Sequence, residues 1–108
     1  MTYTVKSIPQ FEREAKRLVK KYPSLKNELK EIVGVLKKDP EKGTSLGNNV
    51  FKIRLAIASK GKGKRGGARI ITYYKTGEGS VYLLSIYDKG KKDTVSDNEI
   101  QKLLDNFL

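Results

Sequence analysis

The run of residues 80–88, SVYLLSIYD, is apolar on both of its faces. Successive side chains of a strand point to opposite sides of the sheet, so such a run needs cover on both sides. It predicts a central strand with further structure packed against each face. This requirement restricts the fold of the chain more than any other feature of its sequence.

Two more strand-like runs come earlier, at residues 50–58 and 68–75. The first alternates between apolar and mixed positions, as a half-buried strand does. Residues 76–79, TGEG, have the composition of a tight turn and join the last two runs into a hairpin. The three runs predict an antiparallel β-meander, whereas residues 41–49, EKGTSLGNN, are predicted to be loop.

Apolar residues at helical spacing predict two helices before the meander and one after it. Ser7 and Gln10 have the spacing of a capping box at the start of the first helix. Pro23 and Ser24 separate the first helix from the second. So short a connection makes the two helices fold back as an antiparallel hairpin.

A short strand at residues 2–6 and a last helix near Ser96 complete the prediction. Ser96 and Glu99 again have capping-box spacing. The expected order is β-α-α-β-β-β-α, an α+β fold in which an N-terminal strand and a helical hairpin pack on the meander. No repeat or linker divides the chain, so we expect a single domain over residues 1–108.

The chain is strongly basic, with 23 Lys and Arg against 12 Asp and Glu and a net charge of +11. This imbalance favours phosphate-rich or acidic partners. Cysteine and histidine are absent, which excludes disulfides and Cys/His zinc sites, and we expect no cofactor. The first residues, MTYTVKSIPQ, contain no apolar signal core, and no segment is long enough to span a bilayer. We therefore expect a cytoplasmic protein without a membrane partner.

Residues 60–69, KGKGKRGGAR, contain five cations, four glycines and no acid. They lie between two predicted strands, so we expect a mobile cationic loop at the edge of a rigid sheet. Residues 61–66 match the pattern GxGxxG, but a dinucleotide site needs that motif to lead from a strand into a helix. A loop of this composition suits a polyanion, and RNA is the first candidate.

Further cations are expected to gather around this loop. In a meander the end of the third strand lies beside the start of the second, so Arg69 should approach the turn after Asp88. Lys52 and Arg54 share one face of the first strand. The residues predicted to bind RNA are Lys52, Arg54, Lys60, Lys62, Lys64, Lys91 and Lys92.

Tyr87 ends the third strand, where it could stack on a base, take part in proton transfer, or be an ordinary half-buried tyrosine. No metal site is predicted, because histidine is absent and the acids near Asp97 flank a helix start. RNA cleavage by attack of the 2′-OH on its own phosphate stays open. Arginine and lysine could align the phosphate and stabilise its added negative charge, while a lysine of lowered pKa or Tyr87 could move the proton.

Several features together resemble the RelE/ParE toxin superfamily and look closest to its RelE-like HigB branch. They are the order β-α-α-β-β-β-α, residues 51–54 (FKIR), residues 59–71 (SKGKGKRGGARII) and residues 82–89 (YLLSIYDK). The resemblance implies a toxin of a bacterial type II toxin–antitoxin system. It further implies a ribosome-dependent mRNA endoribonuclease that needs no metal and is silenced by a cognate antitoxin.

The same resemblance suggests roles for single residues. Arg69 matches the phosphate-binding arginine that opens the middle strand of the family's meander. Tyr87 matches the residue that closes the last strand, and Lys89 follows it. The predicted catalytic residues are Arg69, Arg65, Tyr87 and Lys89. An antitoxin helix is expected to cover Ile71 and Tyr73, which share a strand face with Arg69.

Two other functions stay open. Members of the ParE type inhibit DNA gyrase by protein contact, and a non-catalytic RNA- or ribosome-binding module would use the same electrostatics without cleavage. The basic cluster argues against the gyrase function, because that branch does not depend on a basic catalytic cleft.

Overall fold

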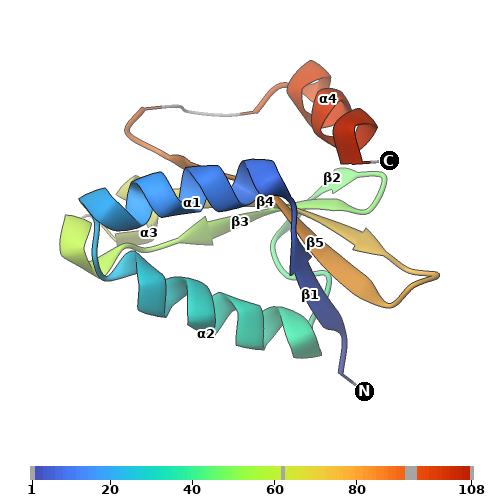
Figure 1. Ribbon diagram of the computed structural model, residues 1–108, viewed down its shortest axis with the longest axis horizontal. Helices are drawn as coiled ribbons and strands as arrows, with labels where there is room; N and C mark the ends of the chain where they lie inside the picture. Colours follow the sequence, from blue (N-terminus) through green and yellow to red (C-terminus); the bar gives the residue numbers. More distant parts are fainter. Residues whose placement is uncertain (1, 62, 92–94, 108) are drawn as a thin grey trace.

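The computed structural model describes residues 2–61, 63–91 and 95–107, which form one five-stranded sheet with helices on both faces (Figure 1). In chain order the elements are β1 (Thr4–Ser7), α1 (Pro9–Lys21), α2 (Leu25–Lys38), β2 (Thr44–Gly47), β3 (Val50–Leu55), the 3₁₀ turn η1 (Ala58–Lys60), the single-turn α3 (Gly63–Gly66), β4 (Ala68–Lys75), β5 (Ser80–Asp88) and α4 (Asp97–Phe107). The predicted α+β fold is confirmed, with β2, η1 and α3 as additions.

β5 is an inner strand of the sheet, whose order is β1-β5-β4-β3-β2. It pairs in parallel with β1 and antiparallel with β4. Val81, Leu83 and Ile86 enter the core beneath α1 and α2. Leu84 and Tyr87 enter the core beneath α4 on the opposite face. The predicted central strand with cover on both sides is therefore confirmed.

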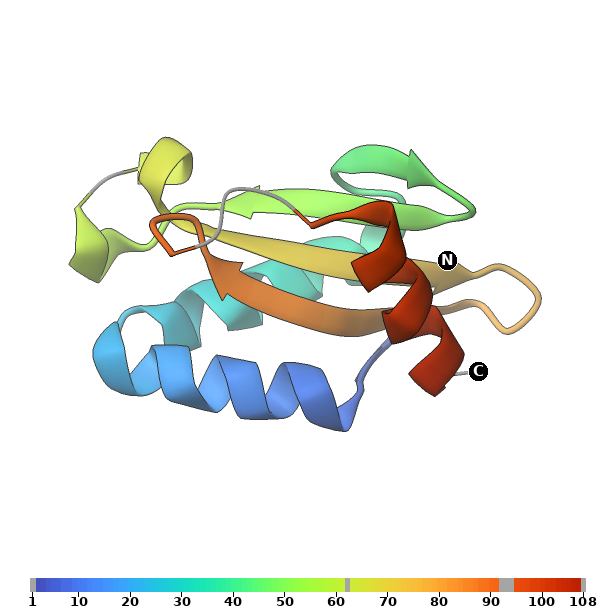
Figure 2. The same ribbon diagram turned by 90° about the horizontal axis from the view of Figure 1, so that it is seen from above.

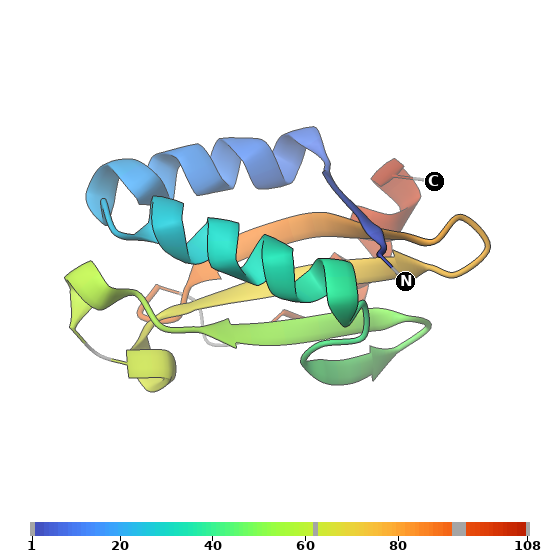
Figure 3. The same cartoon turned by 90° about the horizontal axis from the view of Figure 1, so that it is seen from below.

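The helices α1 and α2 lie antiparallel along one face of the sheet (Figures 1 and 3). Leu25 and Leu36 of α2 are fully buried in this layer. On the other face, Leu103 and Leu104 of α4 pack with Ile71 of β4. The predicted helical hairpin is thus present, and each face of the sheet has its own hydrophobic core.

The predicted capping box of the first helix is wrong, because α1 begins at Pro9 and Ser7 still belongs to β1. The Ser7 hydroxyl instead donates to the Glu12 carboxylate at 3.0 Å. Proline suits the first helical position, where an N–H would have no partner in the helix. The capping box of α4 is confirmed: Ser96 Oγ accepts from the N–H of Glu99 at 3.2 Å, and the Glu99 carboxylate accepts from the N–H of Ser96 at 3.3 Å.

The prediction that residues 41–49 are loop is also wrong, because Thr44–Gly47 forms β2 and pairs antiparallel with β3. Asn48 and Asn49 connect the two strands with φ values of 53° and 63°. Two successive residues of positive φ suit the twist of a tight hairpin, and asparagine tolerates this conformation better than most residues. The sequence signal of this strand is weak, because Leu46 is its one large apolar residue.

A bulge between β4 and β5 sets which side chains share a face near the strand ends. The register shifts between Ile71 and Thr72, so β5 carries one extra residue there. Arg69 consequently lies opposite Tyr87 of β5. Arg54 of β3 lies opposite Arg69 on its other side. All three side chains project from the face of the sheet that α4 covers.

The connection from β3 to β4 is folded where we expected an open loop. β3 ends at Leu55, short of residue 58, and the chain then forms η1 and α3. Gly67 passes so close to β3 that a Cβ there would lie 2.0 Å from the carbonyl oxygen of Leu55. The Gly67 carbonyl also accepts a hydrogen bond from the N–H of Lys89 at 3.0 Å. A glycine here lets the chain enter β4 in contact with both neighbouring strand ends.

Candidate nucleic-acid interface

Three connections meet at one end of the sheet: the α1–α2 link, the β3–β4 link and the turn after β5 (Figures 2 and 3). They enclose a cleft of about 630 Å³. Its lining residues are Lys21, Tyr22, Arg54, Lys60, Arg65, Gly66, Arg69, Asp88, Lys89, Gly90 and Lys91. Seven of these described residues are cations and one is an acid, so the cleft suits an anionic ligand.

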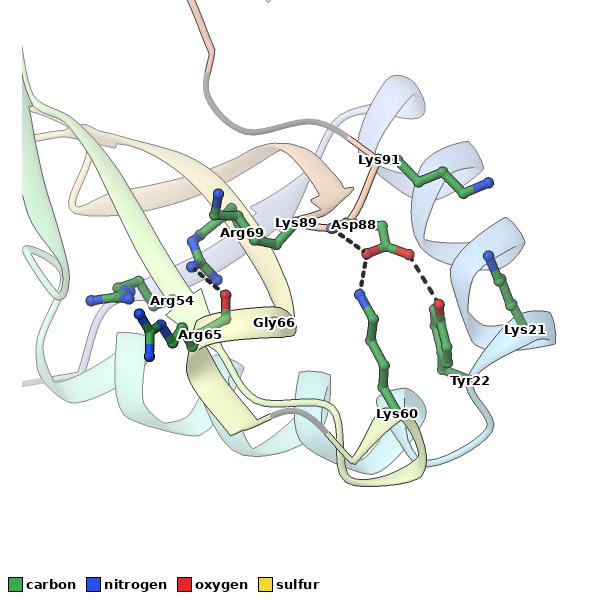
Figure 4. Close-up of a pocket in the computed structure, with 11 residues that line it drawn as sticks. Lys21, Tyr22, Arg54, Lys60, Arg65, Gly66, Arg69, Asp88, Lys89 and Lys91 are labelled. Carbon is green, nitrogen blue, oxygen red and sulfur yellow. Dashed lines mark hydrogen bonds and ion pairs between the residues drawn. The ribbon is translucent and has the colours of Figure 1, made fainter.

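Arg69 opens β4 and is only 4% exposed. Its guanidinium donates to the carbonyl oxygen of Ala68 at 3.0 Å and to that of Arg65 at 3.4 Å, and Figure 4 draws the second of these bonds. Burial lowers the pKa of Arg69, and the like charge of Arg54 lowers it further. Both effects disfavour the cation, and an anion bound beside it would relieve both.

Asp88 joins three segments of the chain. Its carboxylate accepts hydrogen bonds from the Tyr22 hydroxyl at 3.0 Å and the Gly90 N–H at 2.9 Å, and it forms an ion pair with Lys60 (Figure 4). Burial raises the pKa of Asp88, but the bonds from Lys60, Gly90 and Tyr22 outweigh it and hold the pKa below its ordinary value of 3.8. The carboxylate is therefore ionised at neutral pH, with its charge balanced inside the protein.

A second polar network fastens η1 to the start of α2. The hydroxyl oxygens of Ser24 and Ser59 lie 2.8 Å apart, and the N–H of Ser59 donates to Ser24 Oγ at 2.9 Å. The Glu28 carboxylate accepts from the N–H of Ala58 at 2.7 Å. The expectation of a mobile loop over residues 60–69 is therefore wrong at its start: Ala58 and Ser59 are bonded to the helical hairpin, and Lys60 is paired with Asp88 of β5.

The cleft brings together six of the residues that the sequence predicts for the site. They are Arg54, Lys60, Arg65, Arg69, Lys89 and Lys91. The expected approach of Arg69 to the turn after β5 is present. Lys60 differs from the others, because its ammonium group is paired with Asp88 and only 10% of its side chain is exposed. It therefore holds the cleft together and is not the free docking cation that we expected.

One of the remaining predicted RNA-binding residues, Lys52, does not line the cleft. Lys52 is half-buried on β3 opposite Ile71, farther along the strand. Lys62 and Lys92 lie outside the described residues. Lys64 is placed by its backbone alone, within α3.

Tyr87 packs in the core beneath α4, is 8% exposed and does not line the cleft. Burial raises the pKa of its hydroxyl, although the charge of Arg69 opposes this shift. A phenol with a raised pKa stays protonated at neutral pH, so it is unsuited to take a proton from a 2′-OH. Its side chain instead borders a second groove, between α1 and β5.

The sequence does not single out three lining residues: Lys21, Tyr22 and Asp88. One signal for Asp88 is its place directly before the cationic turn KGKK, where an acid has cations within reach. No comparable signal exists for Lys21 and Tyr22. Their place in the cleft depends on how the helical hairpin sits on the sheet, which residue spacing does not define.

α4 covers the strand face that we expected an antitoxin helix to use. Ile71 is fully buried against this helix. The ring of Tyr73 lies 5.9 Å from the ring of Phe107, centre to centre. The protein's own helix occupies this position in the structure, and antitoxin contact at Ile71 and Tyr73 stays a prediction.

Replacing Asp88 by asparagine is expected to cost about 2 kcal/mol of stability at neutral pH, because the buried ammonium group of Lys60 loses its counter-charge. The lowered pKa means that the ionised carboxylate stabilises the folded state above about pH 4, and that this contribution is lost as the pH falls through the folded-state pKa. The variant should therefore lose stability less steeply than the wild type on acidification. Thermal melts from neutral to acidic pH measure both effects.

The exposed carboxylate of Asp105 on α4 provides the control, and Asp105→Asn should melt like the wild type. A melting temperature of Asp88→Asn equal to the wild-type value at neutral pH would show that the ion pair contributes nothing to the fold.

The part of the chain that the structure describes holds no group of three or more His, Cys, Asp or Glu side chains placed to bind a metal ion. None of the helices described in it is long and apolar enough to cross a bilayer.

The fold is shared with solved structures of three toxins. A mutant of the E. coli toxin RelE in the free state, with two arginines replaced by alanine, matches with a TM-score of 0.67 and 14% identity over 100% of both chains. The toxin–antitoxin complex RelBE2 of Mycobacterium tuberculosis matches with a TM-score of 0.60 and 19% identity, over 82% of this chain and 99% of that one. A metal-bound toxin from Helicobacter pylori matches with a TM-score of 0.53 and 19% identity, over 82% of this chain and 97% of that one. The architecture is thus that of a class of small bacterial toxins.

The family follows from the sequence. The model of the RelE toxin of the RelE/RelB toxin–antitoxin system matches residues 9–106, a span that contains every residue lining the cleft. The chain belongs to the RelE toxin family and is a toxin of a toxin–antitoxin system. The resemblance to the RelE/ParE superfamily is therefore confirmed.

Proposed function

We propose that this toxin is a ribosome-dependent endoribonuclease that cuts mRNA in its cationic cleft without a metal ion. The position of Arg69 carries the proposal: it is a buried guanidinium on a sheet strand, between Arg54 on β3 and the cationic turn after β5. A phosphate group matches the planar fork of a guanidinium better than other biological anions do. RNA supplies that phosphate together with an internal nucleophile.

The proposed reaction is attack of a 2′-oxygen on the phosphorus that follows it. The new O–P bond closes a 2′,3′-cyclic phosphate, while the bond from phosphorus to the next 5′-oxygen breaks. The 2′-OH loses one proton and the leaving 5′-oxygen gains one, so the products are a cyclic phosphate and a 5′-hydroxyl. The phosphorane between them carries added negative charge, which Arg54, Arg65 and Arg69 would stabilise more strongly than the starting phosphate.

Lys89 is our candidate for giving the proton to the leaving oxygen. It is half-buried in the cleft lining and lies beside Arg69 in Figure 4. An ammonium group placed there can donate to an oxygen on which charge develops. Asp88 is unsuited to the opposite role of base, because its low pKa and its three hydrogen-bond donors make it a weak proton acceptor.

Affinity for single-stranded RNA is expected to fall steeply with salt. Six cleft cations remain once Lys60 is set aside for Asp88: Lys21, Arg54, Arg65, Arg69, Lys89 and Lys91. If each neutralises one phosphate, log K should fall against log salt with a slope of about −4. Titration of a labelled, non-cleavable 2′-O-methyl oligonucleotide at several salt concentrations measures this slope. Lys52→Ala should leave it unchanged, and a wild-type slope near zero would contradict the electrostatic basis of the proposal.

A map of mRNA 5′ ends after induction in a bacterium tests the proposed activity. The wild type should generate new ends with 5′-hydroxyl groups at in-frame codon positions, and Arg69→Ala should generate none at the same protein level. In-frame positions are expected because the ribosome presents mRNA in register. New ends without a reading frame would contradict the ribosome dependence, and the absence of new ends would contradict cleavage itself.

The same experiment separates the alternative functions. Translation arrest with intact mRNA would indicate a non-catalytic RNA- or ribosome-binding module. Filamentation with DNA damage and intact mRNA would indicate gyrase inhibition of the ParE type. The concentration of cations in the cleft favours cleavage, since inhibition by protein contact does not require it.

The partners that we propose are the ribosome, its mRNA and a cognate antitoxin, and their meeting place is the cytoplasm. The antitoxin follows from the RelE/RelB family and from the M. tuberculosis RelBE2 complex, which contains toxin and antitoxin together. Membership of the HigB branch stays a prediction based on the resemblance of the sequence.

A further inference from the structure

A second groove continues from the cleft between α1 and β5. Its volume is about 370 Å³. Lys21, Asp88 and Lys91 line both cavities, so the groove begins where the cleft ends. The proposed cleavage chemistry uses the arginines at the other side of the cleft and leaves this groove without a function.

The lining of the groove combines apolar and cationic side chains. The apolar ones are Leu18, Ile86 and Tyr87. Arg17 and Lys21 of α1 provide cations on one side, and Lys91 provides one on the other. Figure 4 shows Lys21 and Lys91 on the far side of Asp88 from the three arginines of the cleft. The cations of the groove therefore form a cluster beside α1 that is separate from the arginines of the cleft.

The two acids that line the groove are bonded within the protein. Glu14 accepts hydrogen bonds from the Ser85 hydroxyl at 2.9 Å and the Ile86 N–H at 3.3 Å. Asp88 is paired with Lys60. Among the residues that the structure describes, no ion pair joins these acids to the cations of the groove. The positive charge is thus available to a ligand from outside.

We propose that the α1–β5 groove is a second subsite for single-stranded RNA, which holds the nucleotides next to those in the cleft. This inference rests on the proposed function. Single-stranded RNA fits the lining because its phosphates can contact Arg17, Lys21 and Lys91 while its unpaired bases lie on the apolar floor. A duplex does not fit, because its bases are already paired and stacked. The RNA path then runs from the arginines, past the Asp88–Lys60 pair, and along α1.

Two cations of α1 allow a matched test. Arg17 lines the groove, whereas Lys20 is exposed on the same helix and lines neither cavity. Arg17→Gln and Lys20→Gln remove the same charge from the full chain. Fluorescence anisotropy then measures the affinity of non-cleavable 2′-O-methyl oligonucleotides of increasing length for each protein.

The wild type should gain affinity once the oligonucleotide is long enough to leave the cleft and enter the groove. Arg17→Gln should show no such increase of affinity with length. For the longer oligonucleotides, its slope of log K against log salt should be less steep than the wild-type slope by about 0.7. Lys20→Gln should keep both properties. Equal losses in the two variants, or no loss in Arg17→Gln, would overturn the subsite. Loss of antitoxin affinity with unchanged RNA affinity would also overturn it and would assign the groove to the protein partner.

Failure of the proposed function would give a different pattern. The wild type would then bind the shortest oligonucleotide no better than Arg69→Ala does. That result would contradict RNA binding both in the cleft and in the groove. If only the subsite is wrong, the shortest oligonucleotide still depends on Arg69, and Arg17→Gln behaves like Lys20→Gln at every length. Matching thermal melts of the variants establish that each protein is folded.

Discussion

Replacing Arg69 by alanine is expected to slow mRNA cleavage by about 10²–10³-fold, the loss that follows removal of one preorganised group from a developing negative charge. Arg69 should matter most in the cleft because it is buried and bonded to two backbone carbonyls, so its guanidinium is already oriented before RNA arrives. The melting temperature should change little, since the charge of Arg69 is itself disfavoured by burial and by Arg54. Single-turnover cleavage on programmed ribosomes, with toxin in excess, reports the chemical step.

Two further variants define what Arg69 contributes. Lys75→Ala removes a cation from the opposite end of the same strand, where it pairs with Glu78 at 3.6 Å, and should cleave at the wild-type rate. Arg69→Lys keeps the charge but loses the planar fork, so it should recover only part of the activity. Wild-type cleavage by Arg69→Ala would remove this residue from the mechanism.

Replacing Gly67 by alanine is expected to destabilise the protein by about 3 kcal/mol or more. The added Cβ would lie 2.0 Å from the carbonyl oxygen of Leu55 and 3.0 Å from its carbonyl carbon. Both are backbone atoms, so no side-chain rotation can relieve the clash. β3 and β4 would have to separate at the pair Arg54–Arg69, which should also reduce RNA affinity. Chemical denaturation measures the loss of stability, and the oligonucleotide titration measures the loss of binding.

Gly77→Ala is the matched control for this variant. Gly77 lies in the turn between β4 and β5, where an added Cβ would meet no atom within 4 Å. Its replacement should change the stability by less than about 0.5 kcal/mol. Equal stability of the two variants would mean that Gly67 does not pass as close to β3 as the structure indicates.

The elements that the sequence predicts well are those whose signal is local and repeated. The apolar run of β5 predicts that both faces of this strand are covered, because every position contributes to the pattern. Ser96 and Glu99 predict the start of α4, because a capping box involves only four successive residues. β2 is not predicted, because it is a four-residue edge strand with a single large apolar side chain. Its usable signal lies in Asn48 and Asn49, which can both adopt positive φ.

The site is predictable only as far as topology alone determines it. Arg69 and Lys89 come together because neighbouring strands of a meander place those two positions at the same end of the sheet. The side to which Tyr87 points depends on a one-residue bulge, and the pairing of Lys60 with Asp88 depends on the fold of η1. Neither the bulge nor the fold of η1 produces a periodic pattern in the sequence. The approach of Tyr22 to Asp88 depends on the docking of a whole helical hairpin.

The inner position of β5 also determines when the cleft can exist during synthesis. A chain made from its N-terminus has α1, α2 and the β3–β4 pair available first, but β1 stays without a partner until β5 inserts between β1 and β4. Asp88 and the cations that follow it are supplied by the end of that last strand. The nascent chain therefore completes its cationic cleft only after β5 and the turn behind it have been made, which delays the proposed activity relative to the synthesis of the other strands.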